Sequence, residues 1–359
     1  MQRHNGHIRR AAFLAALLLC SGVITTNLSA ADTIDALTGQ TVGVLPFANY
    51  TGTSHAVTTI VPLIYRELYQ HGIDYITSDS LRPTLRQHRI RSVGKIGGDD
   101  ARSIKESTGA TILLTGSLDV YREEGNPDVA ISLRFIDIEQ MKVMAALSIA
   151  ATGEDFAGLF GVGRLSSAEE VAERIVKRIF EQLRKSMDKA AHRPQDEKAR
   201  HRLAVVTFDN TTDTRYAGEI VSGILLSGLV QDGFEVLEPG LVYEMMLHDQ
   251  VVLRGEIRLQ LLRKLADRYD LDFLITGRVE GFSPQRGSVE ETHPEFEFGA
   301  RQLDASTGKV LATYDGSTTG ADSETILGLG RCHSLGELVA RSLKGLRETI
   351  RKESEKRFE

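Results

Sequence analysis

The chain has 359 residues, of which 41% are hydrophobic and 26% are charged, so it can form two ordinary domains and is not a largely disordered protein. Its formal net charge is −6 at pH 7. This acidic balance argues against a nucleic-acid partner and against strong attraction to an anionic membrane, because both would select a basic surface.

The first 31 residues have the pattern of a cleavable export signal. Three arginines between residues 3 and 10 form a basic start, an apolar run follows from Ala11 to Cys20, and small residues precede a cleavage point after Ala31. The apolar run is shorter than the ~20 residues that span a bilayer. We expect the mature protein to start at Asp32, to lie in the bacterial periplasm and to have no transmembrane span.

Cys20 leaves an alternative open, because a cysteine that ends an apolar run can become the lipid-bearing first residue of an outer-membrane lipoprotein. The preceding residue is Leu19, whereas the processing enzyme prefers a small side chain there. If the signal is removed after Ala31, Cys332 is the only thiol left, and an intramolecular disulfide is then impossible.

The rest of the chain consists of two tandem copies of one sequence unit. VGVLPFANYTGT at Val42–Thr53 lies over LAVVTFDNTTDT at Leu203–Thr214 without a gap. After a short insertion in the second copy, the register resumes with Arg134 over Arg301. The duplication predicts a first repeat at residues 41–186, a charged linker at 187–201, a second repeat at 202–351 and a charged tail at 352–359. We expect each repeat to pack as an independent domain.

Apolar spacing predicts the elements of one repeat. In chain order they are a strand at Val42–Phe47, a helix at Val57–Tyr69, a strand at Ile73–Ile76, helices at Ser80–His88 and Asp99–Thr108, a strand at Thr111–Tyr121, a hairpin of Val129–Ile138 with Val143–Thr152, and a helix at Ser167–Ser186. The fold class is therefore α/β (α+β), with two tandem mixed-sheet domains of order β-α-β-α-α-β-β-β-α. The insertion falls in the second hairpin, at GSVEETHPEFEF.

Several strand and turn signatures stand out; the first two occur in both repeats and the third in the second repeat. They are the opening strands Val44–Asn49 and Val205–Asn210, the TG-ending strands Leu113–Gly116 and Leu274–Gly277, and the hairpin LDASTGKVL at Leu303–Leu311. These signatures resemble the envelope family that includes the amino-terminal domain of TolB, the curli secretion protein CsgG and activators of penicillin-binding proteins such as LpoB. The resemblance implies an envelope protein that acts through contacts with other proteins, although such signatures identify a fold better than a task.

A GxGR motif precedes the last helix of each repeat. Its glycines and arginines are candidate ligand or partner residues: Gly161, Gly163, Arg164, Gly328, Gly330 and Arg331. Backbone N–H groups at a helix start, together with an arginine, favour an anion. The alternative is a structural loop in which Ser167 with Glu170, and Ser334 with Glu337, form capping boxes.

Asn49 and Asn210 are further candidates, because each follows the first strand of its repeat, at the sheet edge where α/β proteins commonly bind ligands. Asn is also an ordinary turn residue, and that interpretation is favoured. His293 lies among glutamates in the inserted hairpin, which is typical of a solvated loop rather than a metal site, and Cys332 reads as a small apolar filler.

Catalytic patterns are missing from the sequence: neither a Ser/His/Asp arrangement nor clustered carboxylates nor HExxH occurs at a spacing that chemistry would require. The sequence therefore predicts a non-catalytic periplasmic adaptor or scaffold that binds envelope proteins, without cofactor or metal, and leaves a homo-oligomer open. One alternative is an outer-membrane secretion component of the curli-channel type, which would need a lipid on Cys20. Another is a small anion- or ligand-binding module that uses the GxGR loops.

Overall fold

The computed structural model describes residues 37–91, 94–157, 163–191, 201–249, 257–288, 291–322, 324 and 331–357. The predicted signal and its cleavage point lie outside these residues. Both repeats belong to one compact unit, Thr33–Glu359.

The first repeat forms a six-stranded mixed sheet, called sheet A. Its strands are β1 (Thr41–Val44), β2 (Ala48–Asn49), β3 (Asp74–Ile76), β4 (Ile112–Arg122), β5 (Asp128–Asp137) and β6 (Lys142–Thr152). The order is β3-β1-β4-β5-β6, with β2 beside β4; the pairs of β1 are parallel, and β4, β5 and β6 form an antiparallel meander.

The second repeat forms sheet B with the same topology. Its strands are β7 (Arg202–Val205), β8 (Asp209–Asn210), β9 (Glu235–Val236), β10 (Phe273–Ser288), β11 (Glu291–Asp304) and β12 (Val310–Thr319), in the order β9-β7-β10-β11-β12, with β8 beside β10. The predicted register is confirmed, because Thr115 pairs with Arg134 in sheet A as Thr276 pairs with Arg301 in sheet B. The insertion lengthens the β10–β11 hairpin, as expected.

The helices also occupy equivalent places in the two repeats. In the first repeat they are α1 (Ala56–Gln70), α2 (Ser78–Gln87), α3 (Gly98–Thr108) and α4 (Ala168–Ala191); in the second they are α5 (Ala217–Asp232), α6 (Pro239–His248), α7 (Leu259–Tyr269) and α8 (Leu335–Arg357). The sequence-derived order of elements is confirmed, with the opening strand split into two short strands in each repeat.

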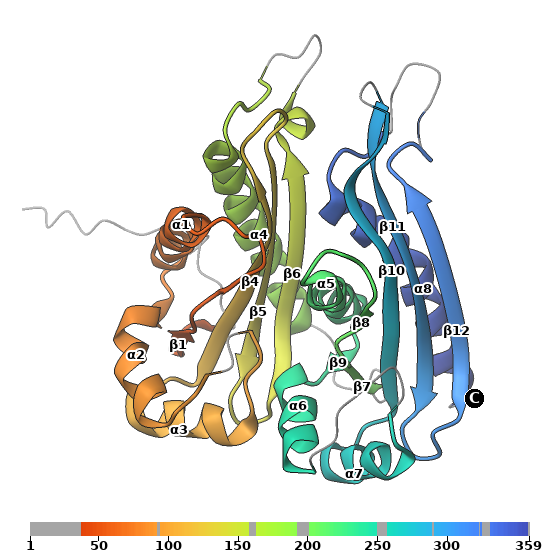
Figure 1. The fold of residues 1–359 in the computed structure, drawn as a ribbon. Coiled ribbons are helices and arrows are strands. Elements are labelled where there is room, and N and C mark those ends of the chain that lie inside the picture. The colour runs from red at the N-terminus through yellow and green to blue at the C-terminus, as the bar shows by residue number, and fades with distance from the viewer. Residues whose placement is uncertain are drawn as a thin grey trace, which may run out of the picture. The chain divides into compact units, whose positions relative to one another are not determined.

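Each face of sheet A is covered by helices. Alternate residues of its strands, such as Leu114 and Phe135, pack against α1 and α4 on one face. On the other face, Val143 and Ala146 of β6 join the core that contains α5 of the second repeat. Figure 1 shows α5 between β6 and β10. The two repeats therefore share a buried interface, in contrast to the independent packing expected from the sequence.

The periodicity of α5 explains this contact. In α1 the buried residues follow one helical stripe, and Thr58, Pro62 and Tyr69 stay exposed. In α5 almost every residue from Ala217 to Leu229 is buried. A helix that is apolar all round is stable only between two layers, and sheet A supplies the second layer.

Candidate functional site

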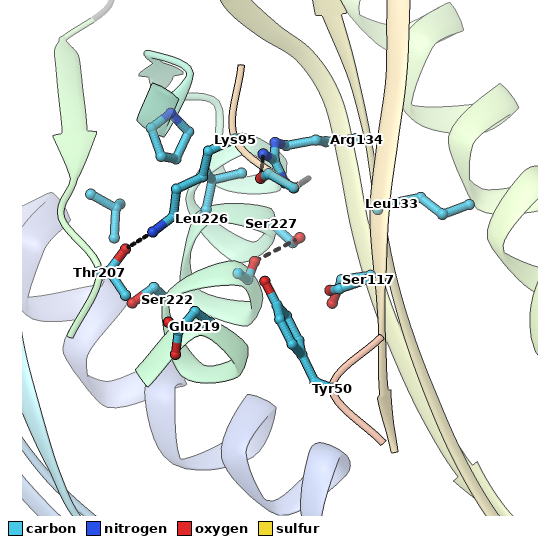
Figure 2. Close-up of a pocket in the computed structure, with 16 residues that line it drawn as sticks. Tyr50, Lys95, Ser117, Leu133, Arg134, Thr207, Glu219, Ser222, Leu226 and Ser227 are labelled. Carbon is cyan, nitrogen blue, oxygen red and sulfur yellow. Dashed lines mark hydrogen bonds between the residues drawn. The ribbon is translucent and has the colours of Figure 1, made fainter. Parts of the chain in front are cut away.

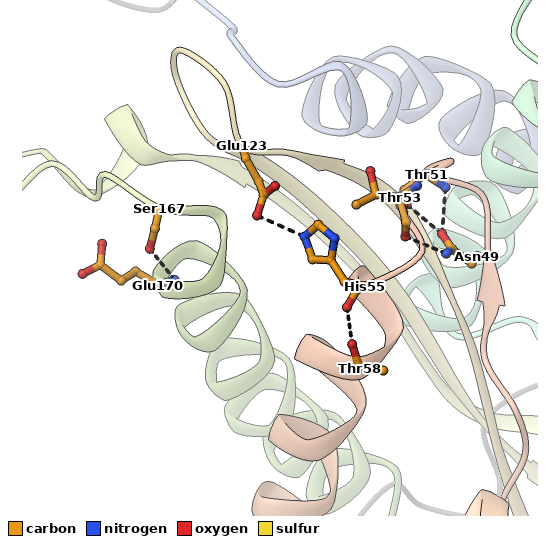
Figure 3. Close-up of polar contacts among 8 residues, drawn as sticks. All are labelled: Asn49, Thr51, Thr53, His55, Thr58, Glu123, Ser167 and Glu170. Atoms are coloured by element: carbon orange, nitrogen blue, oxygen red, sulfur yellow. Dashed lines mark hydrogen bonds and ion pairs between the residues drawn. The ribbon is translucent and has the colours of Figure 1, made fainter.

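The predicted residue Asn49 organises a tight turn at the end of β2, which Figure 3 shows. Its side-chain amide donates to the carbonyl oxygen of Thr53 at 2.9 Å, and its side-chain oxygen accepts from the backbone N–H and the hydroxyl of Thr51 at 3.1 and 2.7 Å. Asn210 makes the same three contacts with Thr214 and Thr212. The polar side-chain atoms of both asparagines therefore form hydrogen bonds within their own turns.

The described part of the GxGR loops contains ion pairs. Arg164 contacts Glu154 at 3.2 Å, and Arg331 contacts Glu324 at 3.1 Å. Gly163 has a positive φ of +87°, which explains why glycine suits this position. Gly161, Gly328 and Gly330 lie outside the described residues, so ligand binding by these loops stays a prediction.

The capping box of the first repeat is formed only in part. The Ser167 hydroxyl accepts from the backbone N–H of Glu170 at 3.2 Å (Figure 3). The Glu170 carboxylate accepts from the backbone N–H of Ser166, one residue earlier than the motif requires. Ser167 therefore contributes to ending the loop and starting α4.

Cys332 is a buried thiol. Its side chain is 2% exposed, and burial, with the nearby charge of Glu337, raises the pKa of the thiol to about 12. A thiol with that pKa stays protonated at neutral pH and is a poor nucleophile. The environment agrees with the sequence interpretation of Cys332 as a packing residue.

A cavity of about 50 Å³ with several polar side chains in its lining lies between sheet A and α5, as Figure 2 shows. Lys95 extends across it and donates to the Thr207 hydroxyl at 2.7 Å, which joins the two repeats. Tyr50 enters from the other side, and its ring packs on Tyr216 with the centroids 4.8 Å apart. Because one water needs ~10–15 Å³, this volume suits a few waters rather than an organic substrate.

Burial changes the pKa of the groups around this cavity. It lowers the pKa of the Lys95 ammonium, and burial together with the charge of Asp119 raises the pKa of Tyr50 to about 12. Burial also raises the pKa of Asp119 to about 7, although the hydroxyls of Ser117 and Ser132 donate to its carboxylate at 2.6 Å each. Tyr50 is therefore neutral at neutral pH, and Asp119 keeps its proton to a much higher pH than a carboxyl group in water does.

A buried ion pair between Arg134 and Glu238 also joins the repeats. The guanidinium of Arg134 on β5 donates to both carboxylate oxygens of Glu238 at 2.8 Å, and to the carbonyl oxygen of Gly94 at 2.5 Å. The Glu238 side chain is 0% exposed and caps the start of α6. The bidentate geometry satisfies charges that would be costly to bury alone.

At the end that holds Leu274 and Leu303, the face of sheet B that corresponds to this interface packs against α6 and α7. The rest of this face has no helix over it within the described residues. We call it the open face; its exposed residues are Arg278, Glu280, Glu297, Arg301, Thr313, Asp315 and Ser317. A hollow in it lies over Gly277 and Gly299. Arg278 and Arg301 make no ion pair with any described residue, whereas Arg134, the equivalent of Arg301, is held by Glu238.

The open face was not predicted from the sequence, where Arg134 and Arg301 served only to align the two repeats. The signal that could have revealed it is the exchange of small residues for charged ones. Where sheet A has Ser117 and Ser148, sheet B has Arg278 and Asp315. Small residues allow a helix to approach a sheet closely, and charged residues keep their face in contact with water or a polar partner.

Two classes of site receive no support from the described residues. No group of three or more His, Cys, Asp or Glu side chains among them is placed to hold a metal ion. Within the same residues, none of the helices is both long and apolar enough to cross a membrane.

Comparisons with known proteins give distant likenesses. No family model matches the chain, and no curated protein matches it. Among solved structures, the PelC dodecamer from Paraburkholderia phytofirmans matches with 21% identity and a TM-score of 0.27, over 40% of this chain and 86% of that chain. The LpoB C-terminal domain from Escherichia coli matches with 14% identity and a TM-score of 0.26, over 33% of this chain and 91% of that chain.

TolB from Acinetobacter baumannii matches with 12% identity and a TM-score of 0.25, over 40% of this chain and 28% of that chain. TolB and LpoB are two of the proteins that the sequence resembles, and the resemblance to CsgG stays a prediction. Matches this distant leave the function of this chain to be argued from its own residues.

Proposed function

We propose that the protein is a non-catalytic scaffold of the bacterial envelope, exported by a cleavable signal, which binds a protein partner through the open face of sheet B. The observation that carries this proposal is that equivalent faces of the two repeats differ in their exposure to solvent. In sheet A the face is covered by α5, and in sheet B the described residues leave it exposed.

The internal interface indicates what the partner supplies. Arg134 is satisfied by a carboxylate that arrives from the neighbouring repeat. Arg301 occupies the same position of sheet B and is exposed. A partner that presents a carboxylate to Arg301 would repeat the bidentate contact at the rim of a new interface.

Site-specific photocrosslinking in the exporting cell tests this function. A photoreactive residue at Thr313, on the open face, should yield a defined adduct with one protein, and a photoreactive residue at Lys177, exposed on α4, should not. The charge reversal Arg301→Glu should remove the Thr313 adduct while the purified variant keeps its unfolding temperature. Equal adduct patterns at Thr313 and Lys177, or an adduct that survives Arg301→Glu, would contradict the proposal.

A further inference from the structure

The segment from Ser80 to Gly98 is strongly basic in an acidic protein. It contains four arginines and Lys95, and it contains no aspartate or glutamate. The four arginines are Arg82, Arg86, Arg89 and Arg91. The segment is therefore locally positive although the overall net charge of the protein is −6.

All four arginines line one surface hollow of about 300 Å³, together with Leu85 and Ile90. We call it the arginine hollow. Arg82 pairs with Asp79 at 3.1 Å, but that pair is exposed and contributes little. Arg86, Arg89 and Arg91 are exposed and make no ion pair with any described residue. Their guanidinium donors are thus available to an anion.

The backbone after α2 holds these arginines in a defined turn. The N–H of Ile90 donates to the carbonyl oxygen of Leu85 at 2.8 Å, and the N–H of Arg89 donates to that of Arg86 at 3.2 Å. This is the hydrogen-bond pattern of a Schellman helix end, with Arg89 in the left-handed position at φ +56°. Glycine is the usual residue there, so arginine occupies the position at a conformational cost.

The second repeat shows that the fold does not need these arginines. Its equivalent helix, α6, has Tyr243 in the place of Arg82, Met246 in that of Leu85 and Leu247 in that of Arg86. A favourable interaction with the helix C-terminus explains at most Arg86, in the last turn of α2, and leaves Arg89 and Arg91 unexplained.

We propose that the arginine hollow binds a phosphate group. Guanidinium groups form paired, charge-assisted hydrogen bonds with phosphate oxygens, and several arginines around one hollow match an anion with several acceptor oxygens. The phosphate belongs either to a small soluble phosphate compound or to the headgroup of an anionic phospholipid. The chemistry of recognition is the same for both.

The test uses a double variant designed to preserve the fold. Arg86→Gln keeps a good helix former on α2, and Arg89→Gly places the preferred residue at the left-handed position. The matched control is Arg174→Gln with Lys177→Gln, which removes the same charge from exposed positions on α4. Calorimetric titration with inorganic phosphate is one arm, and co-sedimentation with phosphatidylglycerol or phosphatidylcholine vesicles is the other.

We expect the double variant to weaken binding by about tenfold or more in at least one arm, because a hydrogen bond to a charged group contributes about 1.5–3 kcal/mol. The control should change it by less than about twofold, because it leaves those hydrogen bonds in place. Loss only with phosphatidylglycerol vesicles identifies a lipid source, and loss with inorganic phosphate identifies a soluble one. Absence of binding in both arms, or equal weakening by the double variant and the control, would overturn the proposal.

Discussion

At the scale of single residues, the most consequential contact is the buried pair of Arg134 and Glu238. Neither charge is tolerated alone in this interior, because removing a charge from water costs several kcal/mol. Their bidentate geometry and the bond to Gly94 satisfy both groups. The duplication also offers a natural control, since Arg301 is the same residue at the same position with its side chain exposed.

We expect Arg134→Ala to lower the free energy of unfolding by about 3–5 kcal/mol, because Glu238 would remain buried without a partner. Arg301→Ala should change it by less than about 0.5 kcal/mol, because an exposed side chain is lost. Urea unfolding of the two variants measures both values. Equal effects at the two positions would show that Glu238 does not depend on Arg134.

Asp119 predicts a dependence of stability on pH. Burial raises its pKa from 3.8 to about 7, so the folded protein holds a proton that the unfolded chain releases. The contribution of Asp119 to stability is then most favourable below about pH 4, and it is lost progressively as the pH rises towards 7. Asp128, whose pKa burial raises to about 6, adds to the same trend.

Asp119→Asn removes the titrating group and keeps a similar shape. We expect the variant to lose less stability than the parent between pH 5 and pH 8, by on the order of 2–3 kcal/mol. Thermal unfolding of both proteins across this range gives the comparison. Parallel curves for parent and variant would mean that Asp119 is ionised in the folded protein.

At the scale of elements, the start of α6 is fixed by a close approach to the first repeat. A Cβ atom on Gly240 would lie 2.1 Å from the carbonyl oxygen of Ile96, which is backbone and cannot rotate away. Gly223 in α5 is a matched contrast, because a Cβ there meets no atom within 4 Å. The two helical glycines therefore differ in their surroundings rather than in their secondary structure.

We expect Gly240→Ala to destabilise the protein by about 1–3 kcal/mol, because the backbone around Ile96 must shift. Gly223→Ala should stabilise it by about 0.5–1 kcal/mol, because alanine restricts the unfolded chain without a clash. Unfolding midpoints of the two single variants test the pair. A neutral Gly240→Ala would show that α6 can move away from Ile96.

Sequence periodicity was sufficient for the elements and insufficient for their contacts. The alternation in Val129–Ile138 and the helical stripe in Val57–Tyr69 report burial of one face, and those elements were predicted correctly. The apolar character of α5 on every side also reports burial, but periodicity does not say against which layer. The Arg134–Glu238 pair joins residues 104 positions apart, and such a contact leaves no local pattern in the sequence.

At the scale of the whole molecule, the two repeats are coupled although they are similar. One hydrophobic core contains residues of both, from Val143 and Ala146 on β6 to Leu225 on α5. The sequence predicted a linker at residues 187–201 and could not show that the domains on either side share a core. The same face is buried in the first repeat and exposed in the second. The two repeats therefore have different structural roles although they share one fold.

This coupling predicts one cooperative unfolding transition for the full chain. Unfolding of one repeat alone would expose the apolar side chains of Val143 and Ala146 and break the Arg134–Glu238 pair, so the two repeats should unfold together. A protease site inserted into residues 192–200, between α4 and β7, provides the sharper test, because cleavage there removes the covalent link and leaves both elements uncut. The two fragments should stay together in size-exclusion chromatography at neutral pH, and Arg134→Ala should make them separate. Fragments that separate without this substitution, or two resolved calorimetric transitions, would mean that each repeat is stable without the other.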